Sequence, residues 1–217
     1  MTDNYNGNII KFNASWDFIT YKHFANDQFT FLKIIENKLF ITGYNGFYQL
    51  DANLNLIKIY NSTAANYRSL YFNKINGYFY LCSLNQYSIS VLDIDLNFKK
   101  TINMQSTGPI TTIAGSNQNL YVGTYTGNVI VLENELIIKT FTRVCEKLIS
   151  SITIDAFGFM YISCSQEIRV YDINGKFLSS FVLTQNLFQT GIDSSGRLIV
   201  FNSYTNTSTG SKIDIFY

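Results

Sequence analysis

The chain has 217 residues, of which 47% are hydrophobic, 16% aromatic and only 14% charged, and its formal net charge is +1. This composition excludes an intrinsically disordered chain, which would be poorer in apolar residues and richer in charge. The balanced charge predicts no nucleic-acid partner, because such proteins carry a basic surface, and no apolar run has the length of a membrane span.

The first predicted elements are two strands, residues 8–13 and 16–23. The segment MTDNYNGNII that opens the chain has no basic region followed by an apolar run. We therefore expect no signal peptide, and an intracellular (cytoplasmic) or virion-associated protein. The chain is rich in Asn, Ile, Tyr, Phe and Lys. AT-rich codons encode these residues, so we expect an AT-rich genome, that of an amoebal or ciliate host or of a large DNA virus.

A repeat of about 40 residues organises the rest of the chain. Five apolar triplets are equivalent, at residues 39–41, 79–81, 120–122, 160–162 and 198–200. Their last residues lie 40, 41, 40 and 38 positions apart. This is the period of a four-stranded propeller blade.

Each repeat reads as four strands, named a to d in chain order. In the fourth repeat these are LISSITID, FMYISCS, EIRVYD and KFLSSFVL, with turns at Ala156-Phe-Gly and Ile173-Asn-Gly. Alternating apolar and polar positions are typical of strands with one buried face. No window of the sequence favours a helix.

The repeats predict a single all-β domain over residues 1–217, a β-propeller of four-stranded antiparallel blades. The predicted blades cover residues 28–64, 65–107, 108–145 and 146–185, and a closing blade joins residues 186–217 to residues 1–27. Such a closure of five blades by both chain ends removes free sheet edges. The alternative is an incomplete six-bladed propeller that needs a partner to close. We therefore expect a monomer or a closing dimer.

The repeat resembles the NHL repeat, whose blades read as an apolar-Gly-Ile-Ala-Val-Asp strand, a Gly turn, apolar-Tyr-Val, and Arg-Ile-Gln-Val-Phe-Asp followed by Gly and Phe. Residues 150–181, SSITIDAFGFMYISCSQEIRVYDINGKFLSSF, carry this pattern almost throughout, and residues 189–202, QTGIDSSGRLIVFN, carry its first half. The resemblance implies a propeller. It does not imply one activity, because NHL-like propellers serve many roles.

The three cysteines, Cys82, Cys145 and Cys164, are an odd number in a chain of this length, so we expect no disulfide framework and a reducing compartment. Cys82 and Cys164 fall on predicted b strands, which favours a role as small core residues. Cys145 falls in a d–a loop, where we expect an exposed thiol. The acids that end the c strands are expected to cap their own turns rather than to bind metal.

Polar side chains, most of them small, recur where the a strands would line the central channel, at Thr30, Arg68, Thr111, Ser150 and Gln189. This column holds no carboxylate, which argues against a calcium-dependent hydrolase. The b–c loops beside it carry one tyrosine in each of four repeats: Tyr44, Tyr87, Tyr125 and Tyr204. Tyrosine offers a large contact area at low entropic cost. The binding residues predicted from the sequence are Tyr44, Arg68, Tyr87, Tyr125, Gln189 and Tyr204.

These features favour a non-enzymatic scaffold that binds a protein partner on the loop face of a propeller. No catalytic residue, cofactor or metal site is predicted. A lectin-like propeller is the main alternative, because aromatic and amide groups on repeated loops also suit sugars. An RNA-binding propeller and a hydrolase are weaker alternatives, since the chain has neither a basic stripe nor a cluster of acids.

Overall fold

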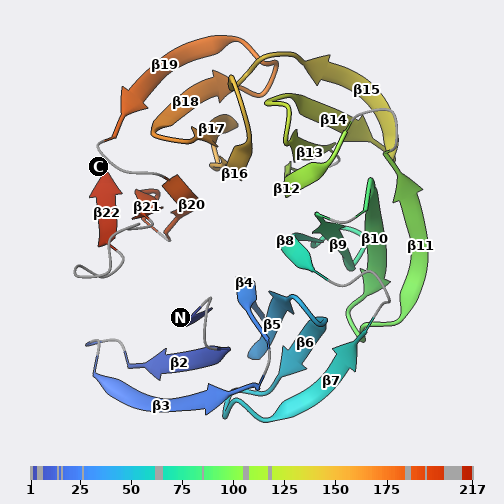
Figure 1. Cartoon of the computed structure of the whole chain (residues 1–217), viewed down its shortest axis with the longest axis vertical. Helices are drawn as coiled ribbons and strands as arrows, with labels where there is room; N and C mark the ends of the chain where they lie inside the picture. The colour runs from blue at the N-terminus through green and yellow to red at the C-terminus, as the bar shows by residue number, and fades with distance from the viewer. Residues whose placement is uncertain are drawn as a thin grey trace. The chain divides into compact units, whose positions relative to one another are not determined.

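The structure, a computed structural model, describes residues 2–3, 7–13, 15, 17–25, 27–61, 66–84, 86–104, 108–116, 119–183, 187–193, 195–202 and 212–216, the last segment and residues 2–3, 187–188 and 201–202 by their backbone alone. The described residues form strands and no helix (Figure 1). Within this part of the chain, no helix is available that could cross a membrane. The chain divides into two compact units, Met1–Asn103 and Met104–Tyr217.

The first unit contains three antiparallel sheets. A three-stranded sheet has β1 (Thr2–Asp3), β2 (Asn8–Phe12) and β3 (Phe18–His23). The next sheet has β4 (Phe29–Ile35), β5 (Lys38–Gly43), β6 (Phe47–Leu50) and β7 (Leu56–Tyr60). The third has β8 (Tyr67–Asn73), β9 (Tyr78–Ser83), β10 (Ser88–Asp93) and β11 (Phe98–Asn103). In each sheet the spatial order of the strands follows the chain, as in a meander.

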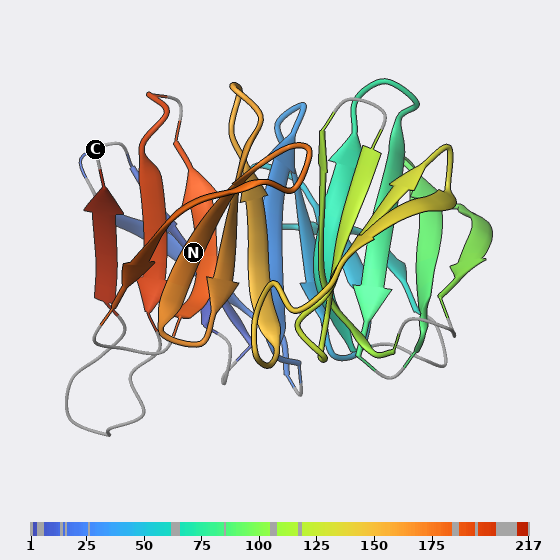
Figure 2. The same ribbon diagram turned by 90° about the horizontal axis from the view of Figure 1, so that it is seen from above.

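The second unit also contains three sheets. The first has β12 (Ile110–Ser116), β13 (Asn119–Thr124), β14 (Val129–Glu133) and β15 (Leu136–Phe141). The second has β16 (Ile149–Ile154), β17 (Phe159–Cys164), β18 (Glu167–Asp172) and β19 (Phe177–Val182). The third has β20 (Leu187–Ile192), β21 (Leu198–Asn202) and β22 (Lys212–Phe216). Figure 2 shows the strands of these sheets running between two ends, where the turns lie.

The two terminal segments each form a three-stranded sheet in the described part of the chain. β3 pairs with β2, with Phe12 opposite Phe18 and Asn8 opposite His23. β22 pairs with β21. On its other side, β2 pairs with β1. The number of blades and the closure of the chain stay predictions.

The turns inside the four-stranded sheets follow one design. Asp93 and Asp172 end their strands, and Asp51 directly follows β6. One carboxylate oxygen of each accepts backbone N–H groups two and four residues on, at 2.8–3.0 Å. Asp155 does the same after β16, at 2.9 Å. Such side-chain caps replace the turn's missing backbone partners. The prediction that the acids at the ends of the c strands cap their own turns is confirmed for Asp51, Asp93 and Asp172.

Two hairpins use a shorter connection. Ile35 pairs with Lys38 and Glu133 pairs with Leu136, so two residues link each strand pair. Those residues have positive φ: 49° and 61° at Glu36 and Asn37, and 48° and 67° at Asn134 and Glu135. Positive φ at both central positions defines the type I′ turn, whose twist matches that of the paired strands.

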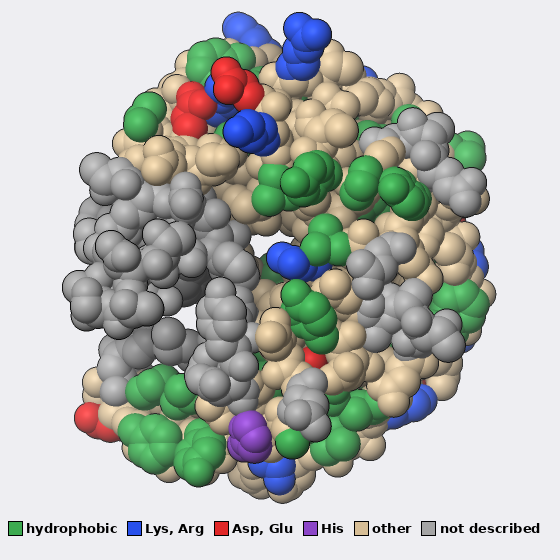
Figure 3. All heavy atoms as spheres, in the orientation of Figure 1, with side chains coloured by type: hydrophobic (Ala, Val, Ile, Leu, Met, Phe, Trp, Pro, Cys, Tyr) green, Lys and Arg blue, Asp and Glu red, His purple; other side chains and the backbone are tan. Residues whose placement is uncertain are grey.

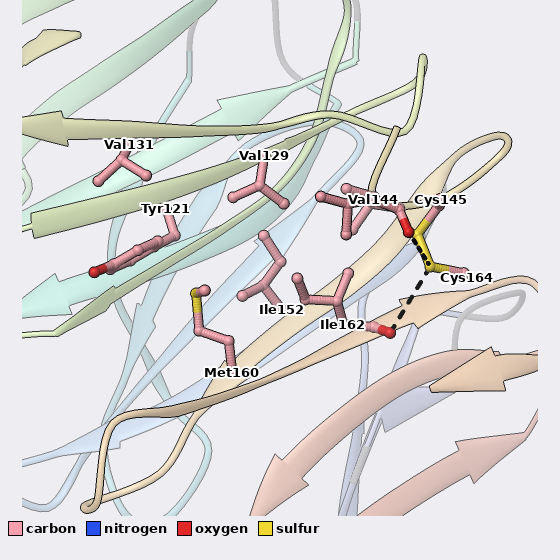
Figure 4. Close-up of a cluster of buried hydrophobic side chains, with 10 residues drawn as sticks. Tyr121, Val129, Val131, Val144, Cys145, Ile152, Met160, Ile162 and Cys164 are labelled. Atoms are coloured by element: carbon pink, nitrogen blue, oxygen red, sulfur yellow. Dashed lines mark hydrogen bonds between the residues drawn. A yellow bond between two sulfur atoms is a disulfide. The ribbon is translucent and has the colours of Figure 1, made fainter. Parts of the chain in front are cut away.

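Neighbouring sheets within each unit pack through their middle strands. In the first unit, Phe40 and Phe47 of one sheet meet Phe79 of the next at ring-centroid distances of 4.6 and 5.0 Å. In the second unit, Figure 4 shows Val129 and Tyr121 close to Ile152, Ile162 and Met160 of the next sheet. Burial of these apolar faces drives the packing, at about 25 cal/mol per Å² of apolar surface.

The first strands of neighbouring sheets are also joined by hydrogen bonds. The hydroxyl of Thr30 donates to the carbonyl of Tyr67 at 2.6 Å, and that of Thr111 donates to the carbonyl of Ile149 at 2.6 Å. Thr153 and Ser151 likewise contact Thr190. These groups would otherwise be buried polar atoms without partners, which is costly. The small polar residues predicted to line a channel therefore serve, at Thr30 and Thr111, to join sheets.

Candidate binding surface

The loop between β5 and β6 presents Tyr44, whose side chain is 38% exposed. The backbone around it is fixed, because Gly43 donates to the carbonyl of Gly46 at 2.9 Å and Tyr44 donates to that of Gln28 at 3.2 Å. The loop thus holds the tyrosine in one place. A rigid aromatic side chain loses little entropy when it binds a partner.

A buried carboxylate supports this loop from below. Asp27 is 4% exposed, and its carboxylate accepts hydrogen bonds from the N–H groups of Gln28 at 2.7 Å and Asn45 at 3.2 Å and from the hydroxyl of Tyr48. Burial, followed by the hydrogen bond to Asp27, raises the pKa of Tyr48. Asp27 was not predicted from the sequence. The sequence shows an acid directly before the predicted first strand (strand a) of a repeat. Nothing in the sequence indicated that Asn45 and Tyr48 would surround this acid.

Two further predicted residues of the first unit occupy exposed or half-buried places. Tyr87 lies in the β9–β10 loop and is 44% exposed. Next to it, Gln86 donates its N–H to the carbonyl of Ser83 at 3.3 Å and accepts a hydrogen bond from the hydroxyl of Ser88 at 3.2 Å. Arg68 lies at the start of β8 and is half-buried, and its Nε has no hydrogen-bond partner among the described residues.

In the second unit, Tyr125 is the most exposed of these tyrosines, at 60%. Its N–H donates to the carbonyl of Pro109 at 2.9 Å, and the N–H of Gly127 donates to that of Thr124 at 3.2 Å. Gly127 has φ +78° and lies so close to the carbonyl of Cys145 that a Cβ would collide with it. Only glycine satisfies both conditions. The Tyr125 loop is therefore pressed against the β15–β16 loop, residues 142–148.

Direct hydrogen bonds join these two loops. Cys145 donates its N–H to the carbonyl of Gly127 at 3.0 Å, and Arg143 donates its N–H to Oδ1 of Asn128 at 2.9 Å. On the other side, Nη1 of Arg169 donates to the carbonyl of Val144 at 2.7 Å, and its Nε pairs with Glu167 at 2.8 Å. The hydrogen bond to Glu167 raises the pKa of Arg169, which burial opposes. Three elements of two neighbouring sheets thus form one connected surface.

A disulfide fixes the same loop. Cys145 and Cys164 are bonded, with a Cα–Cα distance of 5.4 Å (Figure 4). Cys145 is 2% exposed, so the prediction of an exposed thiol was wrong, as was the expectation that the cysteines would not pair. The odd number of cysteines led to the wrong prediction. Cys82 is a buried free cysteine of the first unit, and the other two cysteines pair with each other. Burial raises the pKa of Cys82 to about 12.

A pocket of about 300 Å³ opens beside this disulfide. Its lining comes from residues 145–148, 164–165, 167 and 169, none of which was predicted from the sequence as a binding residue. The rim carries both signs of charge, with Glu146 and Lys147 exposed and Glu167 paired to Arg169. Its volume is at the small end of the range for a ligand site.

The two remaining predicted binding residues, Gln189 and Tyr204, belong to the second unit. Gln189 lies on β20, opposite Phe201, and is half-buried. Tyr204 lies outside the described residues. Among the residues described, no group of three His, Cys, Asp or Glu side chains is arranged to hold a metal ion. The binding roles of all six predicted residues stay predictions.

Comparisons with known proteins show the fold. No family model matches the chain, and no curated protein matches it. The chain is similar to a solved structure of the Pan2 WD40 domain from Neurospora crassa, with a TM-score of 0.73 over 91% of this chain and 67% of that one, at 13% identity. At this identity the likeness shows the fold alone. The predicted all-β propeller is thus confirmed, whereas membership of the NHL family stays a prediction.

Proposed function

We propose that this chain is a non-enzymatic scaffold that binds a protein partner through the loops that connect the second and third strands of its sheets. One observation carries the proposal. In both units these loops hold a tyrosine exposed on a short backbone turn that is already hydrogen-bonded. Exposed but immobile tyrosines are the side chains that dominate the binding energy of many protein interfaces.

In the second unit the docking surface combines Tyr125 with the pocket beside the disulfide. The hydrogen bond from Cys145 to Gly127 connects the Tyr125 loop directly to one wall of the pocket. An extended peptide could lay its backbone along Tyr125 and place one side chain in the pocket. The charged residues around the pocket would then determine which polar or charged side chain it accepts. These residues are Lys147, Arg169, Glu146 and Glu167.

In the first unit Arg68 contributes in another way. Its Nε is a buried donor without a partner among the described residues, and such a donor costs about 1–3 kcal/mol. An acceptor supplied by a partner would recover that cost. Tyr44 and Tyr87 belong to the loops of the same unit, and Gln189 and Tyr204 remain the corresponding candidates of the second.

The test is a selection from a random peptide display library, followed by affinity measurements by calorimetry. Tyr125→Ala is expected to weaken binding of peptides that dock on the second unit by about 10-fold or more, the effect of losing an interface anchor. Arg68→Ala is expected to do the same for peptides that dock on the first unit. Phe157→Ala is the matched control. Phe157 is an aromatic residue that is 86% exposed, and it lies in the β16–β17 turn, which connects the first and second strands of its sheet rather than the second and third. That variant should bind as the parent does.

Equal affinity of all three variants would remove the proposed surface. A glycan array probed in parallel addresses the carbohydrate alternative: binding there that Tyr125→Ala abolishes, with no peptide selected, would replace the protein-binding proposal by a lectin. Turnover of a substrate that persists in the Tyr125→Ala and Arg68→Ala variants would contradict a purely non-enzymatic role.

A further inference from the structure

The disulfide of the second unit borders the pocket. Cys145 and Cys164 both line this pocket, and they are 2% and 8% exposed. Figure 4 shows their bonded sulfur atoms at one end of the apolar cluster, where they join the β15–β16 loop to the end of β17. A disulfide is reduced when a thiolate reaches one of its sulfur atoms, so access is one of the factors that decide its reactivity. Here the pocket supplies that access.

The size of the pocket decides which thiols can react. Both cysteines are buried, so the surface of a large protein would hold its own thiol away from their sulfur atoms. A small thiol can enter, because the pocket has a volume of about 300 Å³. Cys164 is the more exposed of the two cysteines, and its sulfur is therefore the expected point of attack.

The charges that line the pocket do not repel an approaching thiolate. Glu167 pairs with Arg169 at 2.8 Å, which leaves the exposed Lys147 to balance the exposed Glu146. Figure 3 shows acidic and basic side chains gathered over the sheet of β16–β19. Cationic groups near a cysteine stabilise its thiolate, and a stabilised thiolate leaves faster during exchange. Lys147 and Arg169 therefore favour the reaction at this disulfide.

Hydrogen bonds hold the β15–β16 loop in place without the help of the disulfide. The N–H of Cys145 donates to the carbonyl of Gly127 at 3.0 Å, and Nη1 of Arg169 donates to the carbonyl of Val144 at 2.7 Å. Neither bond involves a sulfur atom, so both remain possible after reduction. They would keep Cys145 close to Cys164, whose Cα lies 5.4 Å away in the bonded form. The two thiols would then be placed to form the disulfide again.

We propose that the Cys145–Cys164 disulfide is a reversible thiol-exchange site, whose substrate is a small monothiol that enters through the pocket. Its thiolate attacks Sγ of Cys164 and forms a mixed disulfide there, while Cys145 leaves as a thiolate. A second small thiolate attacks the sulfur of the bound one, so that a small disulfide departs and Cys164 becomes a thiolate. The two protons of the small thiols end on the two cysteines. Two small thiols are thus oxidised to one disulfide, and the protein disulfide is reduced to two thiols.

The exchange reaction does not depend on the proposed function, because it is measured without any peptide. One consequence does rest on the proposed function: a small thiol bound to Cys164 would fill the pocket that is proposed to accept a side chain of a peptide. In the Cys145→Ser variant, where the mixed disulfide on Cys164 cannot be resolved by Cys145, peptides that dock on the second unit should bind about 10-fold more weakly after thiolation. Unchanged binding there would contradict the use of the pocket by peptides and leave the exchange reaction standing.

The experiment measures how fast mercaptoethanol reduces the full chain, isolated without reductant. Samples are unfolded in iodoacetamide, and mass spectrometry counts one label for the disulfide form, two labels and one mercaptoethanol for the mixed disulfide, and three labels for the reduced form. Reduction that required global unfolding would be at least about 10³-fold slower in the folded chain than in urea, the usual lower bound of the unfolding equilibrium constant. We expect a smaller ratio, and a return to one label when the reduced chain is transferred to the disulfide of mercaptoethanol.

A variant that fills the pocket tests the route of the thiol. Leu148 lines the pocket, so Leu148→Trp should slow reduction of the folded chain by about 10-fold or more and leave that of the unfolded chain unchanged. Lys147→Trp, at an exposed position of the same lining, repeats the test should Leu148→Trp fail to fold. Leu136→Trp is the matched control, because Leu136 is 71% exposed on β15 and does not line the pocket, and it should react as the parent does.

Three results would overturn the proposal. The first is a chain that carries three free thiols when it is isolated without reductant. The second is reduction of the folded parent that is slower than that of the unfolded chain by about 10³-fold or more. The third is a folded Leu148→Trp or Lys147→Trp variant that is reduced as fast as the parent, because the thiol would then not enter through the pocket.

Discussion

Leu54 and Leu96 hold a backbone conformation that glycine holds in three related turns. Their φ values are 66° and 57°, while Gly158, Gly175 and Gly196 have 85°, 85° and 83°. This left-handed conformation costs a residue with a Cβ about 1–2 kcal/mol. The leucines are kept there because their side chains are buried, at 3% and 2% exposure, in the two core clusters of the first unit.

Leu96→Gly should therefore destabilise the protein although it relieves backbone strain. Loss of a buried leucine side chain costs about 2–5 kcal/mol, which exceeds the strain relieved. We expect the free energy of unfolding, measured by urea denaturation, to fall by about 2 kcal/mol. Asn134→Gly is the control: Asn134 has φ 48° in an exposed turn, so the same relief comes with no loss of packing. A stabilised Leu96→Gly variant would show that this side chain is not part of the core.

The turn that follows Asp93 lowers the pKa of its carboxyl. Burial alone would raise the pKa of its carboxyl, but hydrogen bonds from Lys99 and Asn97 lower it to about 2. Lys99 forms an ion pair with it at 2.8 Å. The carboxylate therefore keeps its charge, and with it the cap on the β10–β11 turn, well into acid. The repeated acids of this chain work locally, each within its own hairpin.

At the scale of elements, the β15–β16 loop is restrained by several independent interactions. The disulfide, the hydrogen bonds to Gly127 and Asn128, and the guanidinium of Arg169 all hold residues 143–145. A crosslink that closes a loop of this length contributes about 3 kcal/mol in the chain-entropy model. The loop can therefore form a firm wall for the neighbouring pocket.

The pairing of the cysteines predicts a stepwise pattern of alkylation. Without reductant, the native chain should incorporate no iodoacetamide, because Cys82 is buried with a raised pKa and the other two are bonded. Unfolding without reductant should expose one thiol, and unfolding with reductant should expose all three, counted by mass spectrometry. Labelling of all three without reductant would contradict the disulfide.

At the scale of the whole molecule, stability depends on the apolar faces between sheets. Val131 on β14 is 4% exposed within the core cluster of the second unit. Val131→Asp would bury a charge without a partner, at a cost of several kcal/mol, which is of the order of the total stability of a domain. We expect loss of the cooperative unfolding transition in circular dichroism.

Leu136→Asp provides the matched comparison for that experiment. Leu136 begins β15 of the same sheet but is 71% exposed. Its substitution should change the free energy of unfolding by less than about 0.5 kcal/mol, as surface changes usually do. A soluble, cooperatively unfolding Val131→Asp variant would show that β14 is not buried between sheets.

The fold class and the local chemistry of the turns follow from the amino-acid sequence alone. A period of about 40 residues and a period of two within strands are set by local geometry, so the four-stranded sheets and the caps at Asp51, Asp93 and Asp172 could be predicted. The repeat pattern also identified Tyr44, Tyr87 and Tyr125 as loop residues, and all three are exposed.

Which residues from different segments meet is a property of the folded chain. Asp27 with Tyr48, Cys145 with Cys164, and Arg169 with Val144 lie 19 to 25 residues apart, on elements whose approach depends on how strands pair and loops fold back. Such contacts depend on packing between segments, which the periodicity of a sequence does not encode.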